Sequence, residues 1–340
     1  MTGAAPAGGL TRFSPQEDSG LVDACWELAV AAQPVDDPDG PPLVRSVFTT
    51  SPRRADTAGW LAPGAAAGTW SGFLLLDRPL QGNTHRAQVR LVVAPGRRRS
   101  GLGRVLLTQA LRWAGERGCP LLTGRVREGT AGHAFLTAVG GSPGMVAGRR
   151  VLDLTGLPAA RRAELRGQAE PAAAGYSLLS WTGATPQQHL AGVALVSMAM
   201  EDAPHSPFHR RTPVDAQRIR ERDQGAAERG LRSYTVAARC DRTGELAGLS
   251  QIVTTPQAPG WGFQETTMVD AAHRGHRLGL LLKVALLDLV TEAEAGVRHI
   301  LTENAVGNGP MIAINDALGF RVVDQWATCS LDVPPPTASG

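Results

Sequence analysis

The chain has 340 residues, of which 43% are hydrophobic and 19% are charged, and its formal net charge is +3. This composition excludes an intrinsically disordered chain, and at ~100–200 residues per domain the length favours two domains. The balanced charge and the aromatic content of 5% argue against a surface that binds polyanions or stacks on nucleobases.

The four cysteines are far apart and form no CxxC pair, which is typical of a reduced protein. No apolar run reaches the ~18–20 residues that a membrane span requires. Residues 1–10 lack the charged and apolar regions of a signal peptide. We therefore expect a cytoplasmic protein.

The first half of the chain predicts two strands, a loop, a helix, a third strand and a second helix. A polar segment, 78–84, separates the first two strands, and a basic, glycine-rich loop follows the second. Apolar residues at helical spacing then run from Leu102 to a stop at Gly118. The predicted elements are strands 69–76, 86–93 and 120–126 and helices 102–118 and 134–140.

The second half predicts a similar order of elements, with three strands instead of two before its loop. It follows an Ala/Arg/Pro-rich stretch, 156–174, that we predict to be a linker. A turn signal at 241–244 separates its first two strands. The predicted elements are strands 234–238, 246–253, 265–269 and 298–302 and helices 278–296 and 311–319. Residues 334–340 are a predicted disordered tail.

The two loops and their flanking elements repeat each other. Five positions separate the strand-end Val93 from Arg98, and the same spacing joins Val269 to Arg274. Each arginine is followed five positions later by a glycine that comes after a leucine. The offset between the copies is about half the chain, so we predict a duplicated domain rather than a short-period solenoid.

A strand, a basic glycine-rich turn and a helix start together predict an anion site. The first N–H groups of the helix lack intrahelical acceptors, and the helix dipole places partial positive charge there. Arginine adds charge-assisted hydrogen bonds. The expected ligand is a phosphate or pyrophosphate. The Gly-Lys-Ser/Thr pattern of Mg-ATP sites is absent, and the strand follows a meander instead of opening a dinucleotide-binding βαβ unit.

The segments Val93–Gly103 and Val269–Gly279 resemble the acetyl-CoA pyrophosphate loop of the GNAT N-acetyltransferases, Arg/Gln-x-x-Gly-x-Gly/Ala after a strand. The stretch Asn308–Phe320 is similar to a later helix of that family. The resemblance covers roughly 10–155 and 175–333 and implies a tandem, mycothiol-synthase-like architecture. The implied fold class is α+β, with two GNAT folds that each contain a mixed, mostly antiparallel twisted sheet flanked by helices.

The resemblance implies domains at 1–155 and 175–333, joined by the linker, and acetyl-CoA as co-substrate without a metal. In the second half the implied cofactor-binding residues are Met268, Val269, Arg274, Gly275, His276, Arg277, Leu278, Gly279, Asn304 and Asn308. In the first half they are Val93, Arg98, Arg99, Ser100, Gly101, Leu102 and Gly103. For the two asparagines, helix capping is an equal alternative to bonding of the pantetheine amides.

The sequence departs from the family pattern at two positions of the second half. Arg277 replaces the first patterned glycine of the loop. Asn315 stands where the family has the tyrosine that protonates the leaving thiolate, and asparagine is a poor proton donor. The first half is more degenerate, because Leu136 occupies the tyrosine position and Gly129 the position of Asn308.

Acetyl transfer to an amine requires a base, and only the second half has a candidate near its loop. Glu265 lies four residues before Val269, whereas the corresponding residue of the first half is Val89. We predict that the C-terminal domain is catalytic, with Glu265 as base, and that the N-terminal domain is structural or binds CoA. A solvated carboxylate is the alternative for Glu265, with Thr266 or a water-linked acid serving instead.

The acidic residues Glu201 and Asp202 fall where the family shapes its acceptor pocket and predict a cationic amine; an ordinary polar loop is the alternative. We predict N-acetylation of a small-molecule amine by direct transfer, with no nucleic acid or membrane partner. The alternatives are a protein or peptide amine, a non-catalytic acyl-CoA-binding protein and a nucleotide-phosphate binder.

Overall fold

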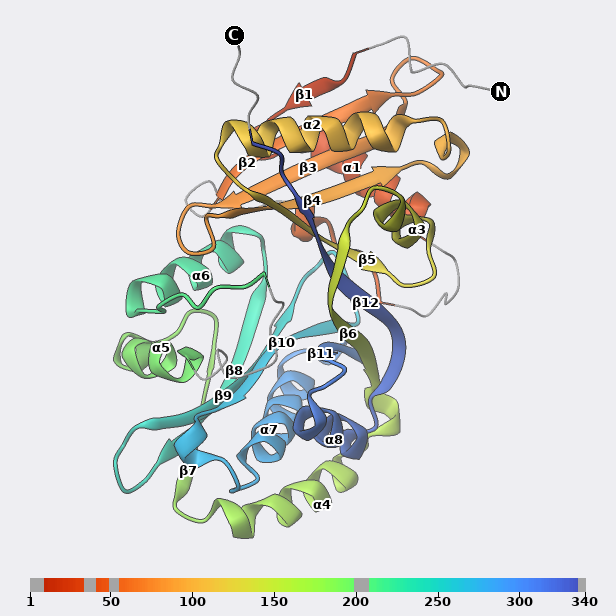
Figure 1. Cartoon of the computed structure of the whole chain (residues 1–340). Coiled ribbons are helices and arrows are strands. Elements are labelled where there is room, and N and C mark those ends of the chain that lie inside the picture. The colour runs from red at the N-terminus through yellow and green to blue at the C-terminus, as the bar shows by residue number, and fades with distance from the viewer. Residues whose placement is uncertain (1–8, 34–40, 49–54, 199–207, 336–340) are drawn as a thin grey trace. The chain divides into compact units, whose positions relative to one another are not determined.

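The computed structural model describes residues 9–33, 41–48, 55–198 and 208–335 (Figure 1). These residues form two compact units. Unit 1 contains the described residues up to Met145 together with 208–212 and 326–335, and unit 2 contains 146–198 and 213–325.

Unit 1 is built on a sheet with helices on both faces. Its strands follow the order β1 (Thr11–Phe13), β2 (Ala55–Pro63), β3 (Trp70–Pro79), β4 (Arg86–Val93), β5 (Leu121–Arg127) and the end of β12 (Arg321–Asp332). All neighbours are antiparallel except the parallel pair β4–β5. The helices are α1 (Ser19–Ala32), α2 (Leu102–Glu116) and α3 (Ala131–Ala138).

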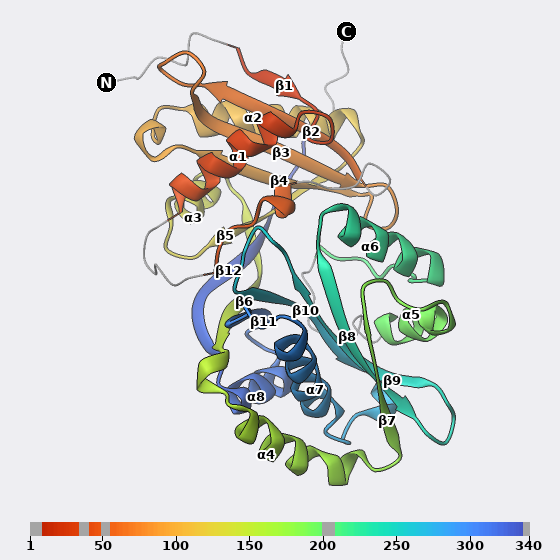
Figure 2. The ribbon, with the colours of Figure 1, turned by 180° about the vertical axis from the view of Figure 1, so that it is seen from behind.

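Side chains along β3 alternate between the two faces of the sheet, and both sets are apolar, which explains why helices cover both faces. Phe73 and Leu75 pack on the α1 side, whereas Leu74 and Leu76 pack on the α2 side. Figure 1 shows α2 in front of the strands, and the reverse view in Figure 2 shows α1 in front of them. A strand that is buried on both faces is nearly continuously apolar, as this one is.

Unit 2 repeats this plan. Its sheet runs from β6 (Ser142–Asp153) through β11 (His299–Ala305), β10 (Trp261–Val269), β9 (Leu246–Thr254) and β8 (Arg232–Cys240) to β7 (Tyr176–Thr182). Only β10 and β11 are parallel. One face carries α5 (Leu190–Met198) and α6 (Ala216–Glu228), and the other carries α4 (Ala159–Ala169), α7 (Leu278–Ala293) and α8 (Gly309–Leu318). The predicted α+β fold and its duplication are confirmed.

The boundaries of the units differ from the predicted domains 1–155 and 175–333. Residues 147–153 of β6 pair with β11 of unit 2, although β6 follows the elements of the first half. Residues 326–332 of β12, at the end of the second half, pair with β5 of unit 1. Each sheet is therefore completed by a strand from the other half of the sequence. A repeat in sequence specifies local elements, but tertiary packing selects the partner of an edge strand.

The segment 156–174, predicted to be a linker, contains α4 and forms part of the core of unit 2. Leu165 and Ala169 are buried with the apolar residues of α7. Arg162 and Arg166 both form ion pairs with Asp288 of α7. The Ala/Arg-rich composition did not indicate an amphipathic helix, because the buried face of α4 is narrow. Of the predicted tail, 336–340 lie outside the described residues.

Candidate active site

The parallel strands β10 and β11 separate and leave a fork in the sheet of unit 2. Their pairing covers only Trp261–Phe263 with His299–Leu301, although β10 continues to Val269 and β11 to Ala305. In unit 1, β4 and β5 pair only over Arg86–Gln88 and Leu121–Thr123. Beyond these short pairings, the facing edges of the strands offer backbone donors and acceptors to an extended ligand.

Glu265 lies at a bulge on β10. The register between β10 and β9 shifts between Gln264 and Thr266. The Gln264 amide supports the bulge by donating hydrogen bonds to the backbone carbonyls of Gln251 and Thr266, both at 2.8 Å. A bulge re-aims the side chain of the extra residue, and that of Glu265 is exposed.

The surroundings of Glu265 favour its protonated form. Desolvation by the surrounding protein raises the pKa of the Glu265 carboxyl, and the guanidinium groups of Arg229, which follows the end of α6, and of Arg222 on α6 oppose this rise. Because the side chain itself is open to solvent, the cause is the protein mass around the bulge and not an enclosing pocket. A carboxylate that is both accessible and more basic than usual suits proton abstraction.

The backbone N–H of Val269 points into the fork. The N–H of Asp270 donates to the Ala247 carbonyl of β9 at 2.9 Å, so the preceding N–H is directed to the opposite side of the strand. Of the two predicted backbone donors, Met268 and Val269, the N–H of Val269 is therefore the one directed toward a ligand in the fork. Met268 has its side chain buried against the α5 cluster. In unit 1 the bond from Ala94 N–H to the Ser71 carbonyl, at 2.9 Å, directs the N–H of Val93 in the same way.

The loop before α7 forms a nest of backbone donors. Gly275 and Arg277 have positive φ angles of 88° and 53°, and the first bonds of the helix are made by residues 280 and 281. Within the described part of the chain, the N–H groups of residues 275–279 make no backbone hydrogen bond. Successive free N–H groups at a helix start bind anions, so the predicted phosphate site has the required backbone.

The two loops have the same backbone with glycine and arginine exchanged. In unit 1 the positive φ angles belong to Arg99, at 63°, and Gly101, at 87°. These positions correspond to Gly275 and Arg277. Each loop thus has one glycine and one arginine in the left-handed region, and the absence of the first patterned glycine in the second loop does not change the fold of the nest.

The loop arginines bind the loop itself. The Nε of Arg274 donates to the Val269 carbonyl at 3.3 Å, and that of Arg98 donates to the Val93 carbonyl at 3.4 Å. Arg277 donates to the Gln168 carbonyl of α4 at 3.1 Å. These contacts hold the strand end and the helix start in position, which keeps the donors of the nest aligned.

Two histidines of the loop contact Tyr176 of β7. The hydroxyl of Tyr176 lies 3.0 Å from Nδ1 of His273, and its ring packs on His276 with a centroid separation of 5.2 Å. In the loop of unit 1, the Ser100 hydroxyl instead donates to the Arg97 carbonyl at 2.7 Å. Each loop is therefore braced by side chains of its own unit.

The predicted asparagines have different environments. Asn308 caps α8, since its Oδ1 accepts the N–H of Met311 at 3.3 Å. Asn304 of β11 accepts a hydrogen bond from Asn315, which in turn accepts one from Lys283. Lys283 is not among the site residues predicted from the sequence. The available signal was a single lysine, the only one in the chain, within an apolar helical pattern.

In unit 1 the corresponding strand carries two arginines, Arg86 and Arg90, and no carboxylate. Val89 takes the place of Glu265, and the next residue, Arg90, donates to the Val47 carbonyl at 2.6 Å and lies 4.6 Å from the Phe48 ring. Burial lowers the pKa of Arg90. The predicted acceptor residues Glu201 and Asp202 lie outside the described residues.

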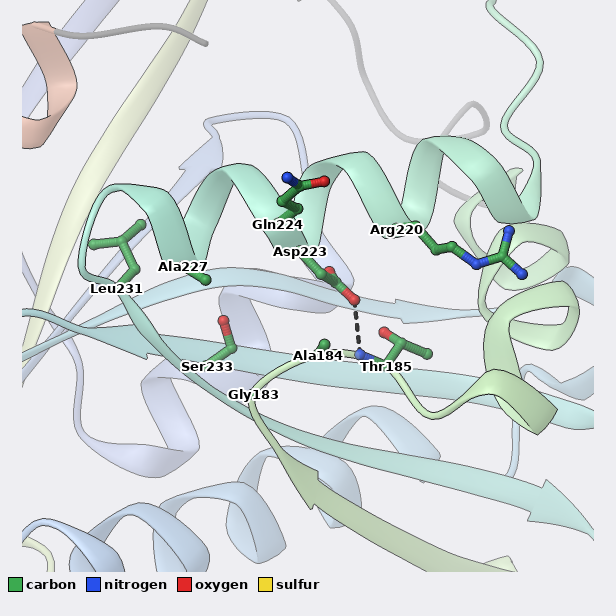
Figure 3. A pocket seen from close by; sticks show the side chains of 9 residues that line it. All are labelled: Gly183, Ala184, Thr185, Arg220, Asp223, Gln224, Ala227, Leu231 and Ser233. Carbon is green, nitrogen blue, oxygen red and sulfur yellow. Dashed lines mark hydrogen bonds between the residues drawn. The ribbon is translucent and has the colours of Figure 1, made fainter. Parts of the chain in front are cut away.

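A hollow of about 300 Å³ lies between α6, the start of β8 and the connection from β7 to α5 (Figure 3). Within it, Asp223 of α6 accepts the N–H of Thr185 at 2.8 Å. None of the predicted site residues lines this hollow. Among the described residues, no helix is long and apolar enough to cross a membrane.

Comparison with known proteins identifies the class. Residues 22–140 match the profile of the acetyltransferase (GNAT) family. No curated protein matches the chain. A tandem GNAT protein from the clavulanic acid biosynthesis pathway, solved without AcCoA, is similar at 28% identity, with a TM-score of 0.77 and coverage of 97% of this chain and 99% of that chain.

A GCN5-related N-acetyltransferase from Sphaerobacter thermophilus has the same fold, at 16% identity, with a TM-score of 0.68 and coverage of 97% of this chain and 98% of that chain. The forked sheets and the nests therefore belong to GNAT folds. The chain therefore has the tandem GNAT architecture.

Proposed function

We propose that this protein is a cytoplasmic N-acetyltransferase that moves the acetyl group of acetyl-CoA to a primary amine of a small molecule. The observation that carries the proposal is the combination, within unit 2, of a donor nest, a forked strand pair and an accessible carboxylate at a bulge. Transfer is direct, in a ternary complex of enzyme, acetyl-CoA and amine.

The nest before α7 binds the pyrophosphate of acetyl-CoA. The N–H groups of residues 275–279 and the positive end of the helix dipole compensate its charge. The pantetheine arm then extends into the fork between β10 and β11. There the N–H of Val269 donates to the thioester carbonyl and stabilises the oxyanion that develops during attack.

Glu265 acts as the base. The amine binds as an ammonium and loses a proton to the Glu265 carboxylate, directly or through water, before its lone pair attacks the thioester. A raised carboxyl pKa makes this transfer easier. The acidic residues Glu201 and Asp202 contribute to recognition of the cationic acceptor.

Unit 1 has a structural or CoA-binding role in this proposal. It has a nest and a fork of the same type as unit 2, but Arg90 occupies the strand position that follows the place of the base. A guanidinium neither accepts the proton of an ammonium nor attracts a cation. Acetylation of amines is therefore assigned to unit 2.

The direct test is release of CoA thiol from acetyl-CoA across a panel of small amines and peptides, with wild type, Glu265→Gln and the control Glu245→Gln. Loss of a general base lowers the rate by about 10²–10⁴-fold. We expect this loss for Glu265→Gln alone, with unchanged binding of acetyl-CoA. Equal rates for Glu265→Gln and wild type would refute the assignment of the base.

A second candidate function, a non-catalytic acyl-CoA-binding protein, is favoured by the complete burial of Asn315 at the tyrosine position of the family. The same assay separates the two functions. Tight binding of acetyl-CoA without turnover on any amine of the panel would support the binding protein. Turnover on peptides alone would move the acceptor to the protein class.

A further inference from the structure

Three side chains of unit 2 form a directed chain of hydrogen bonds. The Nζ of Lys283 on α7 donates to Oδ1 of Asn315 on α8 at 2.7 Å. The Nδ2 of Asn315 donates to Oδ1 of Asn304 on β11 at 2.6 Å. Because the Nζ of Lys283 donates to the carbonyl oxygen of Asn315, the NH₂ group of Asn315 is directed toward Asn304. As a result, the NH₂ group of Asn304 is left to donate outward.

The inner end of this chain lies in an apolar core. Lys283 is 1% exposed and Asn315 is fully buried, and the centroid of the Phe320 ring lies 4.9 Å from the Nζ of Lys283. Burial lowers the pKa of Lys283 to about 7. A buried amine is costly where leucine or methionine would pack, so a purely structural origin does not explain this arrangement well.

The outer end lies at the fork. Asn304 is three residues beyond Leu301, the last residue of β11 that pairs with β10, and it is half-buried. The chain therefore runs from the only lysine of the protein to an amide donor on the parted part of β11, where the acetyl-CoA arm lies under the proposed function.

We propose that Lys283 and Asn315 hold the Asn304 amide as a hydrogen-bond donor to the sulfur of CoA, so that the leaving thiolate is stabilised by a fixed dipole. Lys283 and Asn315 are positioning residues, and Asn304 touches the leaving group. The proposal rests on the proposed function and assigns it a leaving-group site that does not require the tyrosine.

The bonds balance without any further reactant. The amine nitrogen forms a bond to the carbonyl carbon, the carbon–sulfur bond breaks, and its electron pair stays on sulfur. Asn304 donates a hydrogen bond to this pair without losing its proton. The second proton of the amine nitrogen leaves as the tetrahedral intermediate collapses and neutralises the thiolate.

The test compares CoA with desulfo-CoA, which lacks the thiol, because no acceptor amine is needed. Affinities are measured by calorimetry at pH 9, and the ultraviolet absorbance of the thiolate gives the thiol pKa of bound CoA. The variants are Asn304→Ala, the isosteric Asn304→Asp and Lys283→Met. Glu303→Gln is the control, since its side chain leaves the same strand on the opposite face.

A hydrogen bond to a charged group changes an equilibrium by roughly 10- to 100-fold. We expect Asn304→Ala and Lys283→Met to weaken the binding of CoA by about that factor and to leave the affinity for desulfo-CoA unchanged. Asn304→Asp should raise the thiol pKa of bound CoA. The control variant should match wild type.

Equal losses for CoA and desulfo-CoA would show that the chain is structural and would overturn the proposal. Unchanged affinities and thiol pKa in every variant would also overturn it, even if Lys283→Met failed to fold, because Asn304 lies at the accessible end. If wild type bound neither molecule, the proposed function itself would fail.

Discussion

The left-handed backbone of the nest allows a clean stability test at Gly275. Its φ is 88°, and a Cβ added there meets no atom within 4 Å. Steric clash with neighbouring groups is therefore absent, and only backbone strain changes in Gly275→Ala. The matched control is Gly167→Ala in the interior of α4, where a Cβ also meets no atom within 4 Å but φ is helical.

The two alanine substitutions should have opposite signs. A residue with a Cβ in the left-handed region costs roughly 1–2 kcal/mol, and the lower entropy of the unfolded alanine chain offsets about 0.4–1 kcal/mol of that. Gly275→Ala should thus lower the free energy of unfolding by about 1 kcal/mol. Gly167→Ala should raise it by roughly 0.5–1 kcal/mol, as alanine does within helices.

Thermal unfolding followed by circular dichroism measures both changes. For a unit of this size, ~1 kcal/mol corresponds to a shift in Tm of about 2–4 °C. We expect a decrease for Gly275→Ala and an increase for Gly167→Ala. A neutral or stabilising Gly275→Ala would mean that the loop is not left-handed there in solution, and the reasoning about the nest would be refuted.

Further predictions concern the core, the loop and the base. Leu165→Ala should lower the free energy of unfolding by about 2–5 kcal/mol in chemical denaturation, because α4 is part of the core; a change below 1 kcal/mol would instead describe a linker. Arg274→Ala frees the Val269 carbonyl and should reduce the thermal stabilisation by CoA; if neither it nor Arg98→Ala did so, both loop assignments would be incorrect. The rate should fall as the pH falls through the raised pKa of Glu265, since the base must be ionised. Because folding raises the pKa of this carboxyl, the folded state prefers its protonated form, and the stability of the protein decreases as the pH rises through the raised pKa of Glu265. Glu265→Gln should therefore raise the Tm at pH 7. It should also abolish the dependence of both the rate and the stability on this group.

The sequence predicted local elements well where a periodic pattern and a turn signal coincide. The strand predicted at 86–93 is β4 with the same bounds, because alternating apolar residues end at the proline of the following loop. The start of α7 at Leu278 was also predicted, since the glycine-rich loop and the helical period meet there. Both signals depend on residues that are neighbours in the chain.

What the sequence did not predict depends on contacts between distant residues. β6 pairs with β11 of unit 2, and β12 pairs with β5 of unit 1. The hydrophobic pattern of an edge strand does not specify which sheet it joins. The burial of Lys283 follows from Asn315, 32 positions later, which supplies an acceptor inside the core. The bulge at Glu265 likewise depends on the Gln264 amide reaching the Gln251 carbonyl of the neighbouring strand.

The central claim is that unit 2 binds acetyl-CoA with its pyrophosphate on the nest and its thioester in the fork. A crystal structure of the protein soaked with acetyl-CoA tests this claim most directly. We predict phosphate oxygens within hydrogen-bond distance of the N–H groups of residues 275–279 and the thioester carbonyl beside the N–H of Val269. Acetyl-CoA bound elsewhere, with the space between β10 and β11 empty, would contradict the account.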